Sequence, residues 1–363
     1  MSDECSGADV IVIGAGLSGL VATTLLLEQG RSVVLLEAAI RPGGRIQSLR
    51  DAETGDVLGD LGPTWVWPPF QPVVVQWLQR LGLHTFPQFE TGNAALDHGP
   101  AAPVQFQPLP GQNGIARIAG GPVALIDALA ARLPEGVLRT GLAVTAVCVD
   151  EKGVRVEASG NVFSASRVVV AAPLRVAENS INWSPALPDP LRQAMRATPT
   201  WMSVHAKALI VYPTAFWREA GLSGRIASQA GPLVEAHDVS AENTIPAALF
   251  GFVGWPHDMR VAHKDRLDAE IIAQLVRCFG EAAARPAQIH VEDWAANRFI
   301  CTPGDIAEPM NHPDVGPDVL RQAHAGGRIV FAAAETSDVS PGLIEGALAA
   351  GMRAARLVLG SRA

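Results

Sequence analysis

The chain has 363 residues, of which 48% are apolar and 18% charged, and its net charge is −8. This composition supports a large buried core and excludes an intrinsically disordered chain. The length is typical of two domains or of one large α/β domain with an insertion, and the absence of a basic cluster argues against a nucleic-acid partner.

No run approaches the ~20 apolar residues that a membrane-spanning helix needs. The N-terminal MSDECSGAD lacks the charged-then-apolar pattern of a secretory signal. The four cysteines, which have neither metal-site nor disulfide spacing, are Cys5, Cys148, Cys278 and Cys301. We therefore expect a cytoplasmic protein without a metal site that is not bound to a membrane.

A βαβ pattern opens the chain. The apolar run at 10–13 predicts a buried parallel strand, and the run at 20–28 predicts a helix that ends before Gly30. Between them lies the sequence Gly14-Ala15-Gly16-Leu17-Ser18-Gly19. In a dinucleotide fingerprint the first glycine permits the tight turn, the second lets the backbone approach a pyrophosphate, and the third lets the helix pack on the strand.

The end of the second predicted strand, 32–36, supports the same interpretation. Glu37 follows it, at the distance from Gly14 where an acidic residue binds the ribose hydroxyls of an adenosine without a 2′-phosphate. The N-terminus of the intervening helix supplies N–H groups and a positive dipole end for phosphates. The pattern therefore predicts NAD or FAD.

The next residues decide between these two cofactors. Gly43-Gly44-Arg45 comes shortly after Glu37, and the whole segment resembles the N-terminus of the flavin-containing amine oxidase superfamily, whose usual sequence here is E-A-R-x-R-x-G-G-R. The resemblance implies FAD, expected to be non-covalent, with Ala38 and Gly44 at the cofactor and Arg45 facing its diphosphate. Ala39 stands where the family usually has an arginine.

A polar hairpin is predicted at 47–57, followed by a loop that contains Gly62-Pro63-Thr64-Trp65. The resemblance implies that Gly62, Pro63 and Thr64 lie along the flavin and that Trp65 lines the substrate cavity, although a tryptophan packed in a domain core would fit the sequence as well. Residues 72–83 predict an amphipathic helix.

Residues 84–117 are rich in proline and glycine and predict mostly loop. Members of the family usually carry a large helical cap at this point. We therefore expect a much reduced cap and a more open active site, which a homo-oligomer could cover.

From residue 121 the family pattern returns. A helix is predicted at 123–133, a short strand at 137–139, an antiparallel pair at 144–149 and 154–157, and a buried strand at 167–173. The resemblance implies that the backbone of Val144 meets the adenine.

Residues 200–217 predict a strand in which His205, Lys207, Leu209 and Val211 alternate with their neighbours. The chain has three lysines, and Lys207 is the one inside an apolar run, where a lysine needs a partner or a purpose. Lys207, Tyr212, Phe216 and Trp217 match the family pattern K-x-x-x-x-Y/F-x-x-x-F-W, whose lysine holds a water against flavin N5. A lysine on the solvent face of a strand is the alternative.

Further elements are predicted at 247–255 (strand), 265–279 (helix) and 289–294 (strand). The last resembles the family strand that ends in a tryptophan beside the flavin, here Trp294. Phe299 and Cys301 are expected to line the substrate cavity. A covalent flavin thioether at Cys301 is the less favoured alternative to a plain buried cysteine.

The C-terminal segments 328–335 and 341–347 resemble the family motifs R-I-x-F-A-G-T-E and S-G-Y-M-E-G-A. The match implies that Glu335 approaches the diphosphate–ribityl region and that Leu343 and the backbone of Ile344 lie at the flavin. A helix dipole there would stabilise an anionic reduced flavin. A helix is predicted from 346 to 359.

The aromatic cage that flanks the substrate in typical amine oxidases is missing. Leu343 stands where the family has a tyrosine, and Ser340 stands where it has a tryptophan. Phe299, Trp65, Trp67 or Trp255 could replace the cage.

These features together predict an α/β fold, with a Rossmann-like FAD-binding domain (1–83, 116–196 and 297–363) and an α+β substrate domain (84–115 and 197–296). The predicted activity is an FAD-dependent amine oxidase that transfers hydride to flavin N5 from the carbon next to a small-molecule amine, with O2 as acceptor. A flavin desaturase or dehydrogenase with another acceptor, a non-catalytic FAD-binding scaffold and an NAD enzyme stay open.

Overall fold

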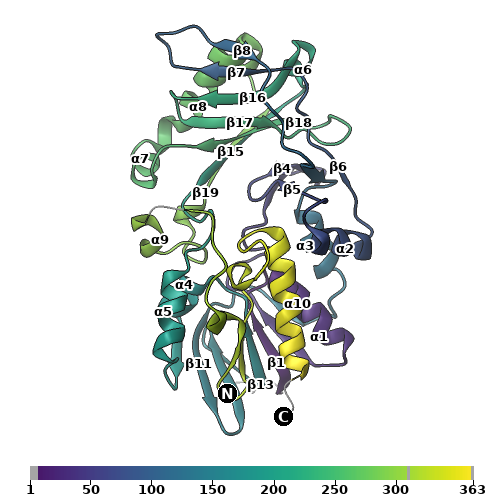
Figure 1. Cartoon of the computed structure of the whole chain (residues 1–363), viewed down its shortest axis with the longest axis vertical. Coiled ribbons are helices and arrows are strands. Elements are labelled where there is room, and N and C mark those ends of the chain that lie inside the picture. Colours follow the sequence, from purple (N-terminus) through teal and green to yellow (C-terminus); the bar gives the residue numbers. More distant parts are fainter. Residues whose placement is uncertain (1–6, 309–310, 361–363) are drawn as a thin grey trace.

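The computed structural model of the chain describes residues 7–308 and 311–360. Two lobes are stacked along its long axis, each built on its own sheet (Figure 1). The lower lobe contains β1 and α10, and the upper lobe contains β15 and α8. Residues 1–6, which include Cys5, lie outside the described residues.

The lower sheet has five parallel strands at its centre. In spatial order they are β10 (Leu138–Arg139), β2 (Val33–Leu36), β1 (Ala8–Ile13), β13 (Asn161–Val170) and β21 (Ile329–Phe331). The first half of β13 instead pairs antiparallel with β12, so the sheet branches there. The remaining strands are β12 (Gly153–Ala158), β11 (Val144–Asp150), β14 (Asn182–Ser184) and β20 (Ala323–His324).

Helices cover both faces of this sheet. Val12 packs on one face against α1 (Leu17–Glu28), α2 (Pro72–Leu81), α3 (Val123–Ala130) and α10 (Ile344–Gly360). Ile13 packs on the other face near α4 (Leu174–Ser180), α5 (Asp189–Ala197) and η3 (Asp318–Arg321). Burial on both faces explains why these strands are continuous apolar runs rather than alternating ones.

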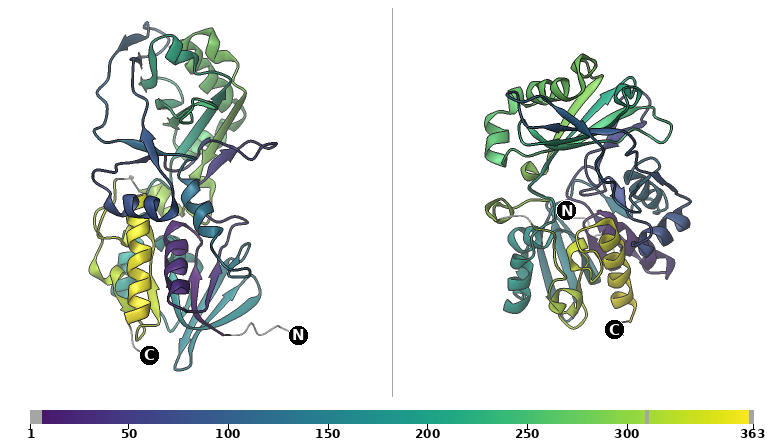
Figure 2. Two further views of the ribbon diagram at one scale, coloured as in Figure 1. Left: turned by 90° about the vertical axis from the view of Figure 1, so that its right-hand side faces the viewer. Right: turned by 45° about the horizontal axis from the view of Figure 1, so that its top comes forward.

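Helices α1 and α10 lie side by side (Figure 2). Their close approach depends on Gly351, because a Cβ atom there would lie 2.4 Å from the backbone oxygen of Ser18. The first and last helices of the lower lobe are thereby packed together, which brings the N-terminus of α10 near the glycine-rich turn.

The upper sheet has seven strands. In spatial order they are β19 (Gln288–Asp293), β15 (Ala206–Tyr212), β18 (Ala247–Val253), β17 (Leu233–Asp238), β16 (Leu222–Ser228), β7 (Asn93–Asp97) and β8 (Gln105–Gln107). One face packs Ile210 and Ala236 against Ile271 of α8 (Lys264–Phe279). The opposite face packs Leu209 and Phe250 toward the lower lobe.

Two small sheets complete the strand inventory: β3 (Ser48–Arg50) with β4 (Val57–Asp60), and β5 (Trp65–Val66) with β9 (Ala116–Ile118) and β6 (Thr85–Pro87). The short helices are α6 (Phe216–Glu219), α7 (His257–Ala262), α9 (Pro303–Ala307), η1 (Glu281–Ala284), η2 (Trp294–Ala296) and η4 (Ala334–Thr336).

One sequence-based expectation is incomplete and another is wrong. Residues 84–117 lie mostly outside helices and strands, as predicted, but they also contain all or part of four short strands, and two of these, β7 and β8, extend the upper sheet. Their short length and their flanking prolines and glycines hid the strand pattern. The strand predicted over 200–217 is confined to β15, and Phe216 begins a short helix instead.

The βαβ unit at the N-terminus is confirmed as β1, α1 and β2. The residue boundaries of the two predicted domains stay a prediction. Within residues 7–308 and 311–360, no helix is both long enough and apolar enough to cross a membrane.

Candidate active site

A cavity of about 1000 Å³ is lined by residues of both lobes. Eighteen of the residues predicted for the site line it: Gly14, Gly16, Leu17, Ser18, Glu37, Ala38, Gly44, Arg45, Gly62, Pro63, Thr64, Trp65, Val144, Lys207, Trp294, Phe299, Leu343 and Ile344. The other four, Ala15, Gly19, Glu335 and Cys301, lie outside the cavity wall. The volume is at the upper end of the usual range for ligand sites.

The glycine-rich turn has the geometry of a phosphate cradle. Gly14 has a φ of +97°, which favours glycine. A Cβ atom at residue 19 would lie 1.9 Å from the Gly14 oxygen, whereas a Cβ atom at residue 16 would meet nothing within 4 Å. Gly19 thus closes the turn onto the helix, and Gly16 leaves backbone open to the cavity where α1 begins.

Glu37 shapes this turn as well as facing the cavity. Its two carboxylate oxygens accept hydrogen bonds from the backbone N–H groups of Ala15 at 2.7 Å and Ala39 at 2.8 Å. Burial raises the pKa of Glu37, against the lowering effect of these hydrogen bonds. Ala15 therefore lies behind the wall, as the donor that fixes Glu37.

Arg45, which lines the cavity, forms an ion pair of 2.7 Å with Glu335, which lies behind the cavity wall. Glu335 also accepts a hydrogen bond from the backbone N–H of Trp201 at 3.1 Å, and its side chain is 3% exposed. Glu335 thus orients Arg45, which lines the cavity, and the approach of Glu335 to the cofactor stays a prediction.

The N-terminus of α10 points at the same cavity. Leu343 and Ile344 line it, and α10 begins at Ile344, two residues before the predicted start. Gly342 has a φ of +79°, and a Cβ atom there would lie 2.7 Å from the Trp201 Cβ. A glycine at this turn is therefore required for the helix to begin beside Trp201.

Lys207 lies on the cavity-facing side of β15 and is 3% exposed. Its Nζ donates to the Gly62 carbonyl oxygen at 2.8 Å and to Thr64 Oγ1 at 2.5 Å, and it lies 4.0 Å from the centre of the Phe250 ring. Burial lowers the pKa of Lys207 to about 7, against the raising effect of Asp60. An amine with this pKa can gain or lose a proton near neutral pH.

A buried pair of charged residues lies near Lys207. Asp60, at the end of β4, and Arg117, on β9, approach to 3.9 Å and are almost inaccessible to solvent. Burial raises the pKa of Asp60, and the same effect lowers the pKa of Arg117. Two further bonds, from Arg117 to the Ser240 oxygen and from Ser48 to Asp60, hold the pair in place.

The half of the cavity beside Lys207 contains residues that the sequence did not single out. Strand pairing aligns Lys207 with Phe252 and Phe252 with Glu235, in a row across β15, β18 and β17. The next row contains Phe250 and His237. Trp65 contacts this cluster, with ring centres 4.8 Å from His237 and 5.2 Å from Phe250.

Glu235 is the acidic residue of this half, since Glu37, the other acid that lines the cavity within the described residues, belongs to the glycine-rich turn. Its ion-pair partner in the described part of the chain is His237 at 3.5 Å, and the hydrogen bond from His237 lowers the pKa of Glu235. The alternation of Phe250 and Phe252 within 247–255 is a signal that could have indicated a cavity-facing strand.

Trp67 and Phe299 also line the cavity, whereas Trp255 does not. Trp294 lines it and donates from its indole nitrogen to the Leu61 oxygen at 3.0 Å. Of the residues considered as replacements for the aromatic cage, Trp65, Trp67 and Phe299 therefore have access to the cavity.

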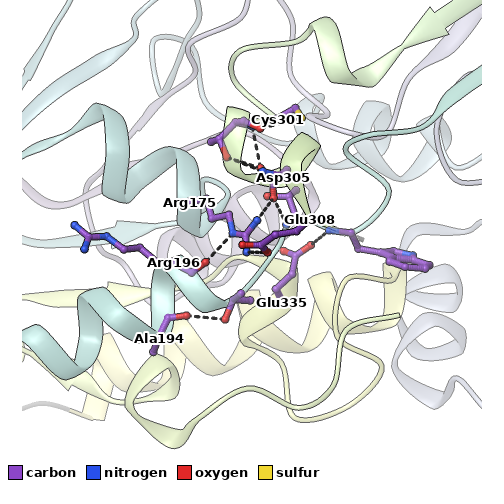
Figure 3. A network of polar contacts seen from close by, with 11 residues as sticks. Arg175, Ala194, Arg196, Cys301, Asp305, Glu308 and Glu335 are labelled. Carbon is purple, nitrogen blue, oxygen red and sulfur yellow. Dashed lines mark hydrogen bonds and ion pairs between the residues drawn. The ribbon is translucent and has the colours of Figure 1, made fainter. Parts of the chain in front are cut away.

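Cys301 is part of a structural network rather than of the cavity wall (Figure 3). Its neighbour Thr302 forms a capping box with Asp305 at the start of α9, and Arg175 donates to Asp305 at 3.1 Å. The Cys301 side chain is buried, and burial raises its pKa to about 11. The expectation that Cys301 lines the substrate cavity is therefore wrong, because its side chain is buried and does not belong to the cavity wall.

The residues present fit an adenine dinucleotide. The Gly14–Gly16 cradle, the opening left at Gly16 and two helix N-termini border one cavity that also reaches Val144 and Lys207. Phosphates are favoured where backbone N–H groups at a helix start are free. No group of three or more His, Cys, Asp or Glu side chains in the described residues could hold a metal ion.

Comparison with known proteins gives the same assignment. The family model of flavin containing amine oxidoreductases matches residues 17–112 and 105–359. The chain belongs to this family. As a flavin containing amine oxidoreductase it is an enzyme, its cofactor is FAD, and the scaffold and NAD alternatives are set aside.

Several curated relatives have low sequence identity to this chain but align over most of its length. Amine oxidase [flavin-containing] B of Rattus norvegicus is 24% identical over 468 residues, covering 99% of this chain and 87% of that protein. The putative flavin-containing monoamine oxidase AofH of Mycobacterium tuberculosis is 31% identical over 246 residues, or 66% of this chain and 51% of that protein. The L-amino acid dehydrogenase of Synechocystis is 25% identical, covering 98% of this chain and 95% of that protein.

Solved structures confirm the predicted α/β fold. Wild-type putrescine oxidase bound to putrescine has a TM-score of 0.80 at 21% identity, with 98% of this chain and 99% of that chain covered. Cyclohexylamine oxidase from Brevibacterium oxydans has a TM-score of 0.81 at 20% identity with the same coverage. The Rossmann-like FAD-binding part and the second, sheet-based part are thus arranged as in amine oxidases.

Proposed function

We propose that this flavin containing amine oxidoreductase is an oxidase of small primary amines that uses O2 as its electron acceptor. The overall reaction is amine plus O2 plus water to aldehyde, ammonia and H2O2. FAD, when bound, supplies the two-electron chemistry at the carbon next to the nitrogen. The roles of the cavity residues below, the O2 acceptor, a cytoplasmic location and a homo-oligomer are all parts of this proposal.

One observation carries the choice of an amine. Glu235 and the aromatic residues Phe250, Phe252 and Trp65 line the same cavity as Lys207. Amines reach an enzyme as ammonium ions, and a carboxylate together with aromatic faces attracts a cation. An apolar or anionic substrate would gain nothing from Glu235.

Lys207 complements this chamber, because its pKa of about 7 makes it a cation that readily becomes neutral. A permanently charged lysine would repel an incoming ammonium ion, whereas a lysine near its pKa can lose its charge as the substrate approaches. The substrate amine must also lose its proton before oxidation, and a neutral Lys207 is a base within the same cavity.

An amino-acid dehydrogenase with another electron acceptor is the second candidate. Arg298 lines the cavity, and its guanidinium lies 4.8 Å from the Phe299 ring centre. An arginine at this position could bind a substrate carboxylate. The simple amine is favoured because Lys207 is buried and because the cavity around it is lined by several groups that attract a cation, namely Glu235 and the aromatic side chains.

The test is anaerobic reduction of the bound flavin, followed by its absorbance, with a panel of alkylamines, arylalkylamines and amino acids. We expect alkylamines or arylalkylamines to bleach the flavin and subsequent air to release H2O2. Bleaching by amino acids alone, without peroxide, would establish the dehydrogenase instead.

Two variants sharpen the test. We expect Glu235→Gln to lower kcat/KM for amines by about fivefold, mainly through KM, since an exposed charge pair contributes about 1 kcal/mol. Glu219→Gln, which changes an exposed acid on α6, is the matched control. Lys207→Met should slow flavin reduction or reoxidation, and a variant that kept both rates would remove Lys207 from the mechanism.

A further inference from the structure

The Lys207 side chain lines the cavity, and its Nζ has three neighbouring protein groups. Two of its directions are taken by protein acceptors, the Gly62 oxygen at 2.8 Å and Thr64 Oγ1 at 2.5 Å. A third side faces the Phe250 ring at 4.0 Å. An ammonium group has three donors and a neutral amine has two, so the chain itself satisfies this group.

Thr64 differs from other buried threonines of the protein. The hydroxyls of Thr198 and Thr336 donate to the backbone oxygens of Ala194 and Ala333, at 2.8 and 2.7 Å, and Thr336 also accepts a hydrogen bond from Arg353. The Thr64 hydroxyl accepts a hydrogen bond from Lys207 but donates to no acceptor among the described residues. A hydroxyl that accepts one hydrogen bond keeps its own proton to donate.

The position of Thr64 gives that proton a direction. Thr64 is 4% exposed, lines the cavity and immediately precedes β5. The loop from Gly62 to Thr64 also follows β4, whose Asp60 belongs to the buried charged pair. The loop therefore stands between the charged interior and the cavity, with one hydroxyl at the boundary.

We propose that Thr64 is a positioning residue that holds the Lys207 amine through its hydroxyl oxygen and keeps its own hydroxyl proton available to a group bound in the cavity. The catalytic value of this arrangement rests on the proposed function, whereas the coupling of Thr64 to Lys207 does not.

Other charged groups near Lys207 also affect its pKa. Asp60 on β4 favours the charged amine, and Arg117 on β9 opposes it. Glu292 is the cross-strand neighbour of Lys207 on β19, and it accepts a hydrogen bond from Gln47 at 3.1 Å. None of these groups is altered by a change at Thr64, so a substitution there tests the hydroxyl alone.

The composition of the chain makes a direct measurement practical, because it has three lysines, Lys152, Lys207 and Lys264. The holoenzyme labelled with [¹³Cε]lysine should give three signals, and Lys207→Met identifies that of Lys207. We expect Thr64→Val to lower the titration midpoint of Lys207 by about one pH unit, since an acceptor for the charged form is lost, and Thr64→Ser to restore it.

Thr23→Val is the matched control, because the Thr23 hydroxyl is buried in α1 without a hydrogen-bond partner in the described structure. It should leave the Lys207 midpoint unchanged. If Thr64→Val does not fold, Thr64→Ala is measured against Thr64→Ser in the same way. A Lys207 midpoint that is the same with and without the hydroxyl, or that Thr64→Ser does not restore, would overturn the proposal.

A second measurement links this coupling to turnover. The pH profile of amine-dependent flavin reduction should move with the Lys207 midpoint in Thr64→Val and return in Thr64→Ser. If no amine reduces the wild-type flavin, the proposed function fails while the lysine titration still decides the role of Thr64. If amines are oxidised but Thr64→Val changes neither the pH profile of flavin reduction nor the Lys207 midpoint, the inference fails and the proposed function stands.

Discussion

Arg45 and Glu335, 290 residues apart in the sequence, form a 2.7 Å ion pair in which the carboxylate is buried and the guanidinium reaches the cavity. The pair joins the segment after β2 to the segment after β21. Arg45 also donates to the Trp201 oxygen at 2.9 Å, so three distant segments meet at one side chain.

The first prediction concerns this pair. Glu335→Gln should reduce the free energy of unfolding by about 3 kcal/mol, because it leaves Arg45 without its charge partner in a largely buried site. It should also weaken flavin retention, because Arg45 loses its orientation. Urea unfolding and the flavin content after gel filtration measure the two effects. Glu219→Gln should change neither, and equal behaviour of the two variants would argue against the role given to Glu335.

The second prediction concerns Glu345 in the C-terminal motif. Its buried carboxylate accepts hydrogen bonds from the backbone N–H groups of Val73 at 3.0 Å and Val74 at 2.7 Å, at the start of α2. Glu345→Gln removes one acceptor and the favourable charge at a helix N-terminus, so we expect a loss of about 1–2 kcal/mol.

Thermal unfolding and urea unfolding would measure that loss. Glu270→Gln, an exposed acid on α8, is its control. A Glu345→Gln protein as stable as the control would show that α2 is capped in some other way.

The third prediction follows from the pKa of Lys207, which burial lowers from 10.5 to about 7. Between these values the unfolded chain binds a proton that the folded chain does not, so stability rises with pH across this window. Below pH 7 the full cost of charging the buried amine is present. Lys207→Met removes this dependence.

We therefore expect Lys207→Met to be more stable than wild type at pH 6. The difference in unfolding free energy between variant and wild type should fall by about 3 kcal/mol between pH 6 and pH 9.5. Urea unfolding of the holoprotein at the two pH values gives the comparison. Lys152→Met, which changes a lysine in an exposed turn, should show no such difference. A pH-independent offset for Lys207→Met would mean that the amine of the folded wild-type protein stays charged across this range, so that burial does not lower its pKa.

The fourth prediction concerns Cys301 and the attachment of the flavin. The Cys301 thiol is buried beside α9, and its pKa is raised to about 11, so it should stay unmodified by iodoacetamide at pH 8 in the folded protein. Acid precipitation should release all yellow colour into the supernatant, and Cys301→Ser should retain the same flavin content. A covalent thioether would be established if the flavin stayed with the precipitated wild-type protein but was released into the supernatant from Cys301→Ser.

The cofactor half of the site could be predicted from the sequence because its signals are local. Gly14, Gly16 and Gly19 serve one turn, and Glu37 ends the neighbouring strand, so their spacing along the chain already contains their geometry. Lys207 could be singled out because a lysine in an apolar strand is rare enough to require an explanation.

The substrate half depends on contacts that no local pattern contains. Glu235 reaches the cavity because β17 pairs with β18, and Lys207 meets Thr64 across 143 residues of chain. Cys301 is buried outside the cavity wall, and the short strands within residues 84–117 form by pairing in other sheets. Sequence alone determined which cofactor the chain binds, because that information is encoded within short segments. Tertiary structure decided which side chains line the cavity beside Lys207, because strand pairing and burial bring them together from separate segments.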